Sequence, residues 1–316
     1  MISRRILLSS ALALALVPQA KADPMLPYSR FVVFGDGLSD QGRWGPLTDY
    51  RYPPSPPFAA GRWTGGPTWV EHLSALSGVP LEARDNHAMG GAITGWWNIN
   101  EPLRAALGLA ADVPLPGLRG QVEAALAAGP ADPEALYILW AGGHDIGNWL
   151  DYGQPDIAAE PPAANLRAAA LRLIGAGARH ILVGTMPDMG ATAIYAGTDK
   201  AARATAATEE LNAGIRAWAP ELSTNGGQVT VLDGAAAFGS AFARAGELGI
   251  TVFDEAYLPY DIIDFANPLA PARPVPEGRD PNAYFSFWAV SAGPQVHRAI
   301  ADYALVALRV AAGQKG

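Results

Sequence analysis

The chain has 316 residues, 50% of them hydrophobic, with 22 Lys and Arg against 30 Asp and Glu, and it contains no cysteine. This length is enough to bury one large core. The net charge of −8 repels phosphate backbones and argues against nucleic-acid binding. Without cysteine, the chain has no thiol nucleophile, thiolate metal site or disulfide.

The first residues match a targeting segment. Two arginines (Arg4, Arg5) precede a short apolar run, 6–17, and an A-x-A cleavage site at 20–22. The run is too short to span a bilayer. We therefore expect a signal peptide over residues 1–22 and a periplasmic or secreted mature protein with 19 bases against 30 acids. The general secretory and twin-arginine routes both stay open.

Continuous apolar runs that stop at Gly or Asp alternate with amphipathic stretches along the rest of the chain. Continuous runs indicate strands buried on both faces, and the alternation with helices indicates a parallel sheet. Proline pairs and a proline-rich stretch predict irregular segments at 52–57 and 259–281. We predict one α/β domain over residues 23–316, with three α/β/α layers around a central, mainly parallel sheet. Its expected strands are 31–34, 136–140, 181–183 and 229–232. Its expected helices include one that begins at Pro67 and ends just before Gly78, then 166–174, 211–218 and a last helix from 294.

Several motifs lie directly after the expected strands, where open α/β sheets bind ligands. Phe34-Gly35-Asp36-Gly37-Leu38-Ser39-Asp40 resembles the F-G-D-S-L-S-D block of the SGNH (GDSL) hydrolases. This resemblance extends in order over the mature chain and implies the flavodoxin-like fold of these esterases and lipases. The other matching segments are Gly61-Arg62-Trp63, the glycine block 86–92, Trp140-Ala141-Gly142-Gly143-His144-Asp145, Pro187-Asp188, and the ending that runs from Phe287-Trp288 to His297.

The resemblance implies which residue stands at each catalytic position. In the family a serine attacks the acyl carbon, a histidine takes its proton and an aspartate orients that histidine. Here the serine position is Gly37, the aspartate position is Ala289 and the histidine position is Ala292, or Ser291 in the other alignment. His144 replaces the asparagine that helps to bind the oxyanion. No triad residue is intact, and only Gly91 and the Gly37 N–H remain as oxyanion donors, with His144 beside them.

Other side chains near these positions have possible roles of their own. His144 with the carboxylates of Asp36, Asp40 and Asp145 raises the possibility of a metal site. The resembling family carries those carboxylates without a metal, so we expect no metal and no cofactor. Ser39, the nearest hydroxyl to position 37, is expected to cap or pack, and His297 is interpreted as structural. Trp96 and Trp97 adjoin the glycine block and are candidates for stacking on a ligand.

The leading hypothesis is an exported family member that is inactive as a serine esterase and keeps a cleft for binding. Its partner would be a small acyl or carbohydrate ligand, or a protein, with no nucleic acid and no membrane span. The second hypothesis is an active ester hydrolase that uses substitute groups such as His144. The third is an interaction module with a vestigial cleft.

Overall fold

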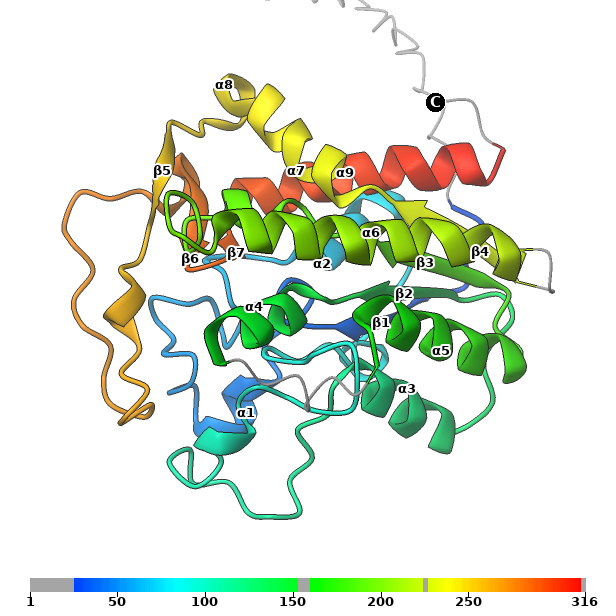
Figure 1. The fold of residues 1–316 in the computed structure, drawn as a ribbon, viewed down its shortest axis with the longest axis horizontal. Helices are drawn as coiled ribbons and strands as arrows, with labels where there is room; N and C mark the ends of the chain where they lie inside the picture. The colour runs from blue at the N-terminus through cyan, green and yellow to red at the C-terminus, as the bar shows by residue number, and fades with distance from the viewer. Residues whose placement is uncertain (1–25, 153–159, 224–226, 314–316) are drawn as a thin grey trace, which may run out of the picture.

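A four-stranded parallel sheet lies at the centre of the computed structural model, which describes residues 26–152, 160–223 and 227–313 (Figure 1). The sheet has the strand order β1-β2-β3-β4, so the predicted parallel sheet is confirmed. The predicted signal peptide lies outside the described residues. The strands are β1 (Phe31–Gly35), β2 (Leu136–Trp140), β3 (His180–Gly184) and β4 (Gln228–Leu232).

The register of the sheet places the ends of β1 and β2 side by side. Both strands are buried along their whole length, and Gly35 pairs with Trp140. On the other side of β1, a single parallel bridge joins Val33 to Asn86. After β1 the chain therefore passes along one side of this strand, at Asn86, and later forms β2 on its opposite side. Such a switch point is where doubly wound sheets bind ligands.

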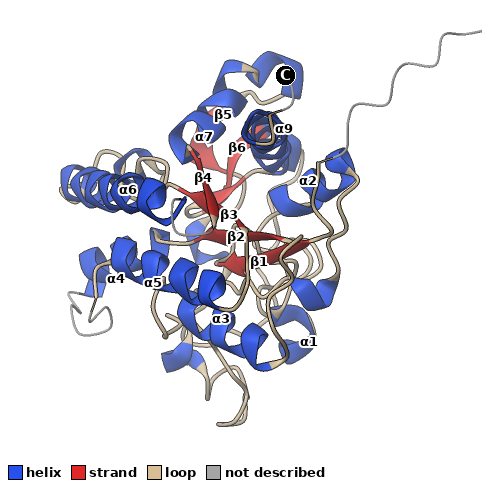
Figure 2. Ribbon diagram, turned by 90° about the vertical axis from the view of Figure 1, so that its right-hand side faces the viewer, coloured by secondary structure: helices blue, strands red, loops and turns tan. Residues whose placement is uncertain are grey.

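Helices cover both faces of the sheet, which confirms the three-layer arrangement (Figure 2). In the first layer, α9 (Pro294–Ala311) packs against α2 (Trp69–Ser77) and α7 (Gly234–Ala243). In the second, α5 packs against α3 and α6, and α6 packs against α4. These helices are α3 (Leu118–Ala127), α4 (Gly143–Tyr152), α5 (Pro162–Gly175) and α6 (Ala201–Ser223), and two short helices are α1 (Trp44–Thr48) and α8 (Ala245–Leu248).

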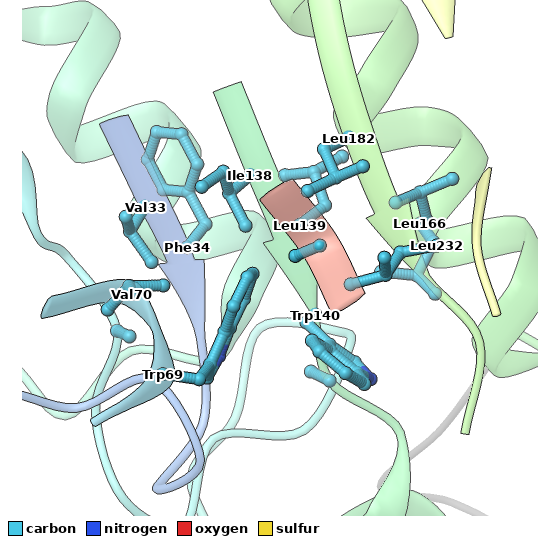
Figure 3. Packing of buried hydrophobic residues seen from close by; sticks show 14 of the residues in the cluster. Val33, Phe34, Trp69, Val70, Ile138, Leu139, Trp140, Leu166, Leu182 and Leu232 are labelled. Carbon is cyan, nitrogen blue, oxygen red and sulfur yellow. The ribbon is translucent and has the colours of Figure 1, made fainter. Parts of the chain in front are cut away.

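Buried strand residues and helix residues fill the space between the layers. Val33, Ile138 and Leu182 come from three adjacent strands and are each at most 1% exposed (Figure 3). At the carboxyl end of the strands, the rings of Trp69 and Trp140 meet edge to face, with centroids 5.1 Å apart. These two tryptophans close the core just beneath the edge where function is expected.

Helix α2 shows how local sequence fixes an element next to that edge. Its N-cap is Thr68, whose N–H donates to the Glu71 carboxylate at 2.8 Å, and its C-cap is Gly78 with φ +72°. The predicted helix end is confirmed, but Pro67 precedes the cap instead of lying in the first turn. The Trp69 N–H donates to Nδ1 of buried His297 at 3.1 Å, so His297 joins α9 to α2.

A second, three-stranded sheet was not predicted. It consists of β5 (Val252–Ala256), β6 (Tyr284–Trp288) and β7 (Ser291–Ala292). The segment 259–281 that precedes β6 is irregular, as predicted, apart from a 3₁₀ turn at Tyr260–Ile262 and the start of another at Pro281–Ala283. β6 and β7 form an antiparallel hairpin whose turn places Ala289 at φ +47°. This hairpin carries the last motif of the sequence to the sheet edge. Among the described residues, no helix combines the length and apolar character needed to cross a bilayer.

Candidate functional site

A cavity of about 900 Å³ opens at the carboxyl ends of the central strands. Residues that directly follow β1, β2 and β3 line it, and the β6–β7 hairpin adds another part of its wall. Most of the lining side chains are aromatic or aliphatic. None of the described residues that line the cavity is a lysine or an arginine. The cavity therefore disfavours an anionic ligand and is suited to a largely apolar one.

The cavity brings together the positions that sequence comparison singled out. Gly37, Gly91, His144, Ala289 and Ala292 all line it, although they come from four separate segments of the chain. Ser291, the other candidate for the histidine position, lines it too. The triad positions thus share one site. Glycine stands at the position of the nucleophile, alanine at that of the orienting acid, and alanine or serine, depending on the alignment, at that of the base.

The backbone at Gly37 lies against the ring of Trp63. A Cβ atom at position 37 would lie 3.0 Å from Trp63 Cδ1 and 3.1 Å from Cγ. Both distances are shorter than ordinary van der Waals contacts. A serine at position 37 therefore requires the nearly buried indole to move by a few tenths of an ångström.

Two backbone donors at this corner have no hydrogen-bond partner in the part of the chain that the structure describes. No hydrogen bond joins the N–H of Gly37 or of Gly91 to any other residue that the structure describes. The neighbouring N–H groups of Leu38 and Ser39 both donate to Asp36, the former to its side chain at 3.0 Å. The free pair is what the sequence analysis identified as the remaining oxyanion donors. Such donors bind a carbonyl oxygen or an oxyanion.

His144 lies in the first turn of α4 and is partly exposed to the cavity. No described residue forms a hydrogen bond with its ring. Burial lowers the pKa of His144 to about 4, because the cationic form loses its hydration there. The ring is therefore neutral at pH 7 and a weak base.

Asp36 also lines the cavity, next to Gly37. Its Oδ1 accepts the Leu38 N–H, and the side chain is otherwise enclosed. Burial raises the pKa of Asp36 to about 7, the Leu38 N–H opposes that rise, and the nearby Asp145 adds to it. This carboxyl group changes charge near neutral pH inside the cavity.

The other two predicted carboxylates hold the backbone in place. Asp40 accepts N–H groups of Gly42, Arg43 and Gly90 at 2.8 Å each. Asp145 accepts the N–H and hydroxyl of Thr94 at 2.9 and 2.6 Å. Burial raises the pKa of both groups to about 6. Among the described residues, no three His, Asp or Glu side chains are grouped as metal ligands.

The structure separates the two candidate stacking tryptophans. Trp97 lines the cavity. Trp96 is 55% exposed outside it, and the Arg119 guanidinium lies 4.7 Å from its ring centroid. Ser39 is fully buried, where its hydroxyl accepts the Trp69 indole N–H at 2.9 Å, so it packs as predicted.

The rim of the cavity is aromatic, which the sequence analysis missed. On one side, the ring of Tyr260 stacks on Trp288 with centroids 5.9 Å apart, and Tyr260 is 58% exposed. On another side, Phe242 is 62% exposed, and its ring centroid lies 4.9 Å from that of Phe253. All four residues line the cavity. No local pattern marks them, because their exposure depends on the tertiary arrangement of α7 and the small sheet.

A family model described as GDSL-like Lipase/Acylhydrolase matches residues 31–270. Since the match covers more than half of the chain, this protein belongs to the GDSL-like lipase/acylhydrolase family. The match ends before the β6–β7 hairpin. The assignment of Ala289 and Ala292 to triad positions therefore rests on the motif alone.

Curated relatives share part of their length with this chain. It is 33% identical over 178 residues to a phosphatidylcholine-sterol acyltransferase of Aeromonas hydrophila, covering 56% of this chain and 49% of that protein. It is 27% identical over 219 residues to a thermolabile hemolysin of Vibrio parahaemolyticus, covering 66% and 46%. An uncharacterized protein of the trpE-trpG intergenic region in Pseudomonas putida is 35% identical over 208 residues, covering 60% and 33%. The chain thus spans at most about half of each of these relatives.

Among solved structures, a variant of an acetyl xylan esterase from Geobacillus stearothermophilus aligns with a TM-score of 0.45 and 14% identity, covering 90% of this chain and 96% of that chain. A carbohydrate acetylesterase family member from Sinorhizobium meliloti aligns with a TM-score of 0.44 and 17% identity, covering 90% and 99%.

Proposed function

We propose that this protein binds an acyl ester in its cavity without hydrolysing it. The acyl chain lies along the aromatic wall, and the ester carbonyl oxygen accepts hydrogen bonds from the N–H groups of Gly37 and Gly91. One observation carries the proposal: an apolar cavity retains two unpartnered donors at the point where the nucleophile is missing. Binding at these donors needs no triad, whereas acyl transfer does.

Three features favour an acyl chain over a sugar or a protein partner. The lining is mainly apolar, whereas a sugar needs many polar partners for its hydroxyl groups. Only one of the two adjacent tryptophans faces the cavity, so they do not form a stacking pair. The relative named as a phosphatidylcholine-sterol acyltransferase also favours an acyl ligand.

The first experiment measures turnover and binding on the same purified protein. We expect no hydrolysis of para-nitrophenyl butyrate above the buffer rate, because no activated nucleophile faces the donors. We also expect saturable binding of the methyl ester of pyrene-labelled dodecanoic acid, followed by energy transfer from tryptophan to pyrene. Recovery of the unaltered ester by mass spectrometry completes the test. Absence of saturable binding would contradict the proposal.

A second candidate function, hydrolysis by substitute groups, is favoured by one observation. Asp36 lines the cavity beside Gly37 and has a pKa near 7, which suits a base that activates water. Turnover that is lost in Asp36→Asn, or in the Ser39→Ala and His144→Ala double variant, would establish this function instead. Turnover that persists in both variants would still refute the binding proposal.

The restored triad tests whether the assigned positions are equivalent to those of the family. The variant combines Gly37→Ser, His144→Asn and Ala289→Asp with a histidine at position 291 or 292. Trp63→Phe belongs in a parallel version, because the indole crowds a side chain at position 37. Aspartate tolerates the positive φ of Ala289 better than most residues. Activity in a restored variant would show that the scaffold still supports the chemistry that the natural chain lacks.

The ionisation of Asp36 predicts how the cavity distinguishes an ester from a free acid. As the pH rises from 5.5 to 8.5, Asp36 becomes ionised, since burial places its pKa at about 7. A ligand carboxylate would then be repelled, and its affinity should fall by about tenfold. Affinity for the methyl ester should change much less. The two pyrene-labelled ligands, acid and ester, provide the measurement, and equal pH dependence for both would contradict the prediction.

Export is part of the proposal, on the strength of the charged start, apolar run and A-x-A site in residues 1–22. Mass spectrometry of protein recovered outside the cytoplasm should find an N-terminus at Asp23. A full-length chain that stays in the cytoplasm would contradict it.

A further inference from the structure

The carbonyl oxygen of Gly90 accepts three side-chain hydrogen bonds. The indole Nε1 of Trp44 donates to it at 3.0 Å, the Asn98 amide at 3.0 Å and the Asn100 amide at 3.2 Å. All three side chains are at most 5% exposed. A carbonyl oxygen has two lone pairs and usually accepts one or two hydrogen bonds, so this concentration of donors is unusual.

These bonds act on the same peptide group that ends in the Gly91 N–H. The peptide is trans, so its N–H points away from its C=O and from the three donors. The flanking groups are also held, because the Gly90 N–H donates to Asp40 and the Gly91 carbonyl accepts the Ile99 N–H at 2.8 Å. Among the backbone polar groups from Gly90 N to Gly91 O, only the Gly91 N–H lacks a partner among the described residues. Gly91 itself lines the cavity.

We infer that Trp44, Asn98 and Asn100 are positioning residues that fix the Gly90–Gly91 peptide and polarise its N–H for a ligand carbonyl oxygen. Hydrogen bonds to a carbonyl withdraw electron density from the amide and strengthen its N–H as a donor, the more so in an apolar enclosure. The inference rests on the proposed function for the identity of the ligand group. The polarisation itself is a property of the unliganded protein.

The side chains are connected in a way that a simple packing role does not require. Asn100 donates to Gly90 through its nitrogen while its oxygen accepts the Tyr52 hydroxyl at 2.7 Å. Asn98 donates to Gly90 while its oxygen accepts the Asn100 N–H at 2.9 Å. Each amide is thus oriented by a second bond, so its nitrogen faces the carbonyl. Tyr52 also lines the cavity and links the network to the ligand space.

Trp44→Phe tests the inference, because it removes one donor and leaves an aromatic ring in the core. The first readout is the chemical shift of the Gly91 amide proton in the unliganded protein, which should move upfield as the N–H becomes a weaker donor. The second is affinity for the methyl ester of pyrene-labelled dodecanoic acid, which should fall by about fivefold. Trp69→Phe is the matched control, since Trp69 is equally buried and its indole N–H donates to Ser39 and not to Gly90.

An upfield shift confined to Trp44→Phe, together with weaker ester binding, supports the inference. An unchanged Gly91 shift, equal shifts in both variants, or unchanged affinity overturns it. If the wild-type protein binds no ester but the shift still moves, the proposed function fails while the polarisation stands. Should Trp44→Phe fail to fold, Asn98→Ser takes its place, because serine can still accept the Asn100 N–H in the turn but cannot reach Gly90.

Discussion

Replacing Gly91 by alanine is expected to lower the free energy of unfolding by about 3 to 4 kcal/mol and to abolish ester binding. Gly91 has φ +85°, a conformation that costs alanine energy. The added Cβ would also lie 2.5 Å from Asn98 Oδ1 and would collide with Asn100 Nδ2. Both amides are fixed by their own hydrogen bonds, so they cannot move aside without giving up the bonds to Gly90.

The matched control for this substitution is Gly108→Ala. Gly108 also has a positive φ, +67°, but no atom lies within 4 Å of a Cβ added there. Only the backbone cost remains, and we expect a loss of about 1 kcal/mol. Urea denaturation of both variants measures the difference, and titration with the pyrene-labelled ester measures binding. A Gly91→Ala protein as stable as Gly108→Ala would mean that the loop around Gly90 is more adaptable than its hydrogen bonds indicate.

The central sheet was predictable because its strands need no tertiary information to be recognised. β1 and β2 are apolar at every position, as burial on both faces requires. Residues that line the cavity follow soon after each strand ends. The small sheet was not predictable in the same way. Its strand β5 is half exposed and mixes apolar with acidic residues, so only pairing with β6 defines it.

The candidate site was predictable as far as it depends on residues that directly follow strands. Gly37 and His144 follow β1 and β2, and the register of the sheet brings them together. Trp96 and Trp97 show the limit of this reasoning. Residues 94–96 form a bend, and the path of this loop turns Trp97 toward the cavity while Trp96 faces solvent.

The residues that support Gly91 carried no recognisable signal. Asn98 and Asn100 are two residues apart, and both donate to the same carbonyl because the loop 90–100 folds back on itself. Nothing in the spacing of two asparagines distinguishes this arrangement from an ordinary turn. The loop's return depends on the bond from the Ile99 N–H to Gly91, which only the folded structure reveals.

Asp36→Asn is expected to make the protein more stable than wild type at high pH, and not at low pH. The pKa of Asp36 is about 7 in the folded protein against an ordinary value of 3.8, with burial as the main cause. Its contribution to stability is therefore fully present below pH 3.8 and is lost as the pH rises through 7. The loss amounts to on the order of 4 kcal/mol. Asparagine keeps an acceptor for the Leu38 N–H and does not ionise, so it escapes this loss.

Urea denaturation of wild type and Asp36→Asn at pH 4, 6 and 8 tests this prediction, since titrating groups that do not interact with Asp36 cancel in the difference. Stability of the variant relative to wild type should rise steadily across this range. Asp132→Asn is the control, because hydrogen bonds, first that from the Glu134 N–H, hold the pKa of Asp132 below its usual value of 3.8. Its carboxylate is ionised in both the folded and the unfolded chain above that value, so the stability of this variant relative to wild type should stay nearly constant from pH 4 to 8. If the difference in stability between Asp36→Asn and wild type does not change with pH, solvent reaches the Asp36 carboxylate in the cavity. The predicted difference in pH dependence between ester and acid ligands would then disappear as well.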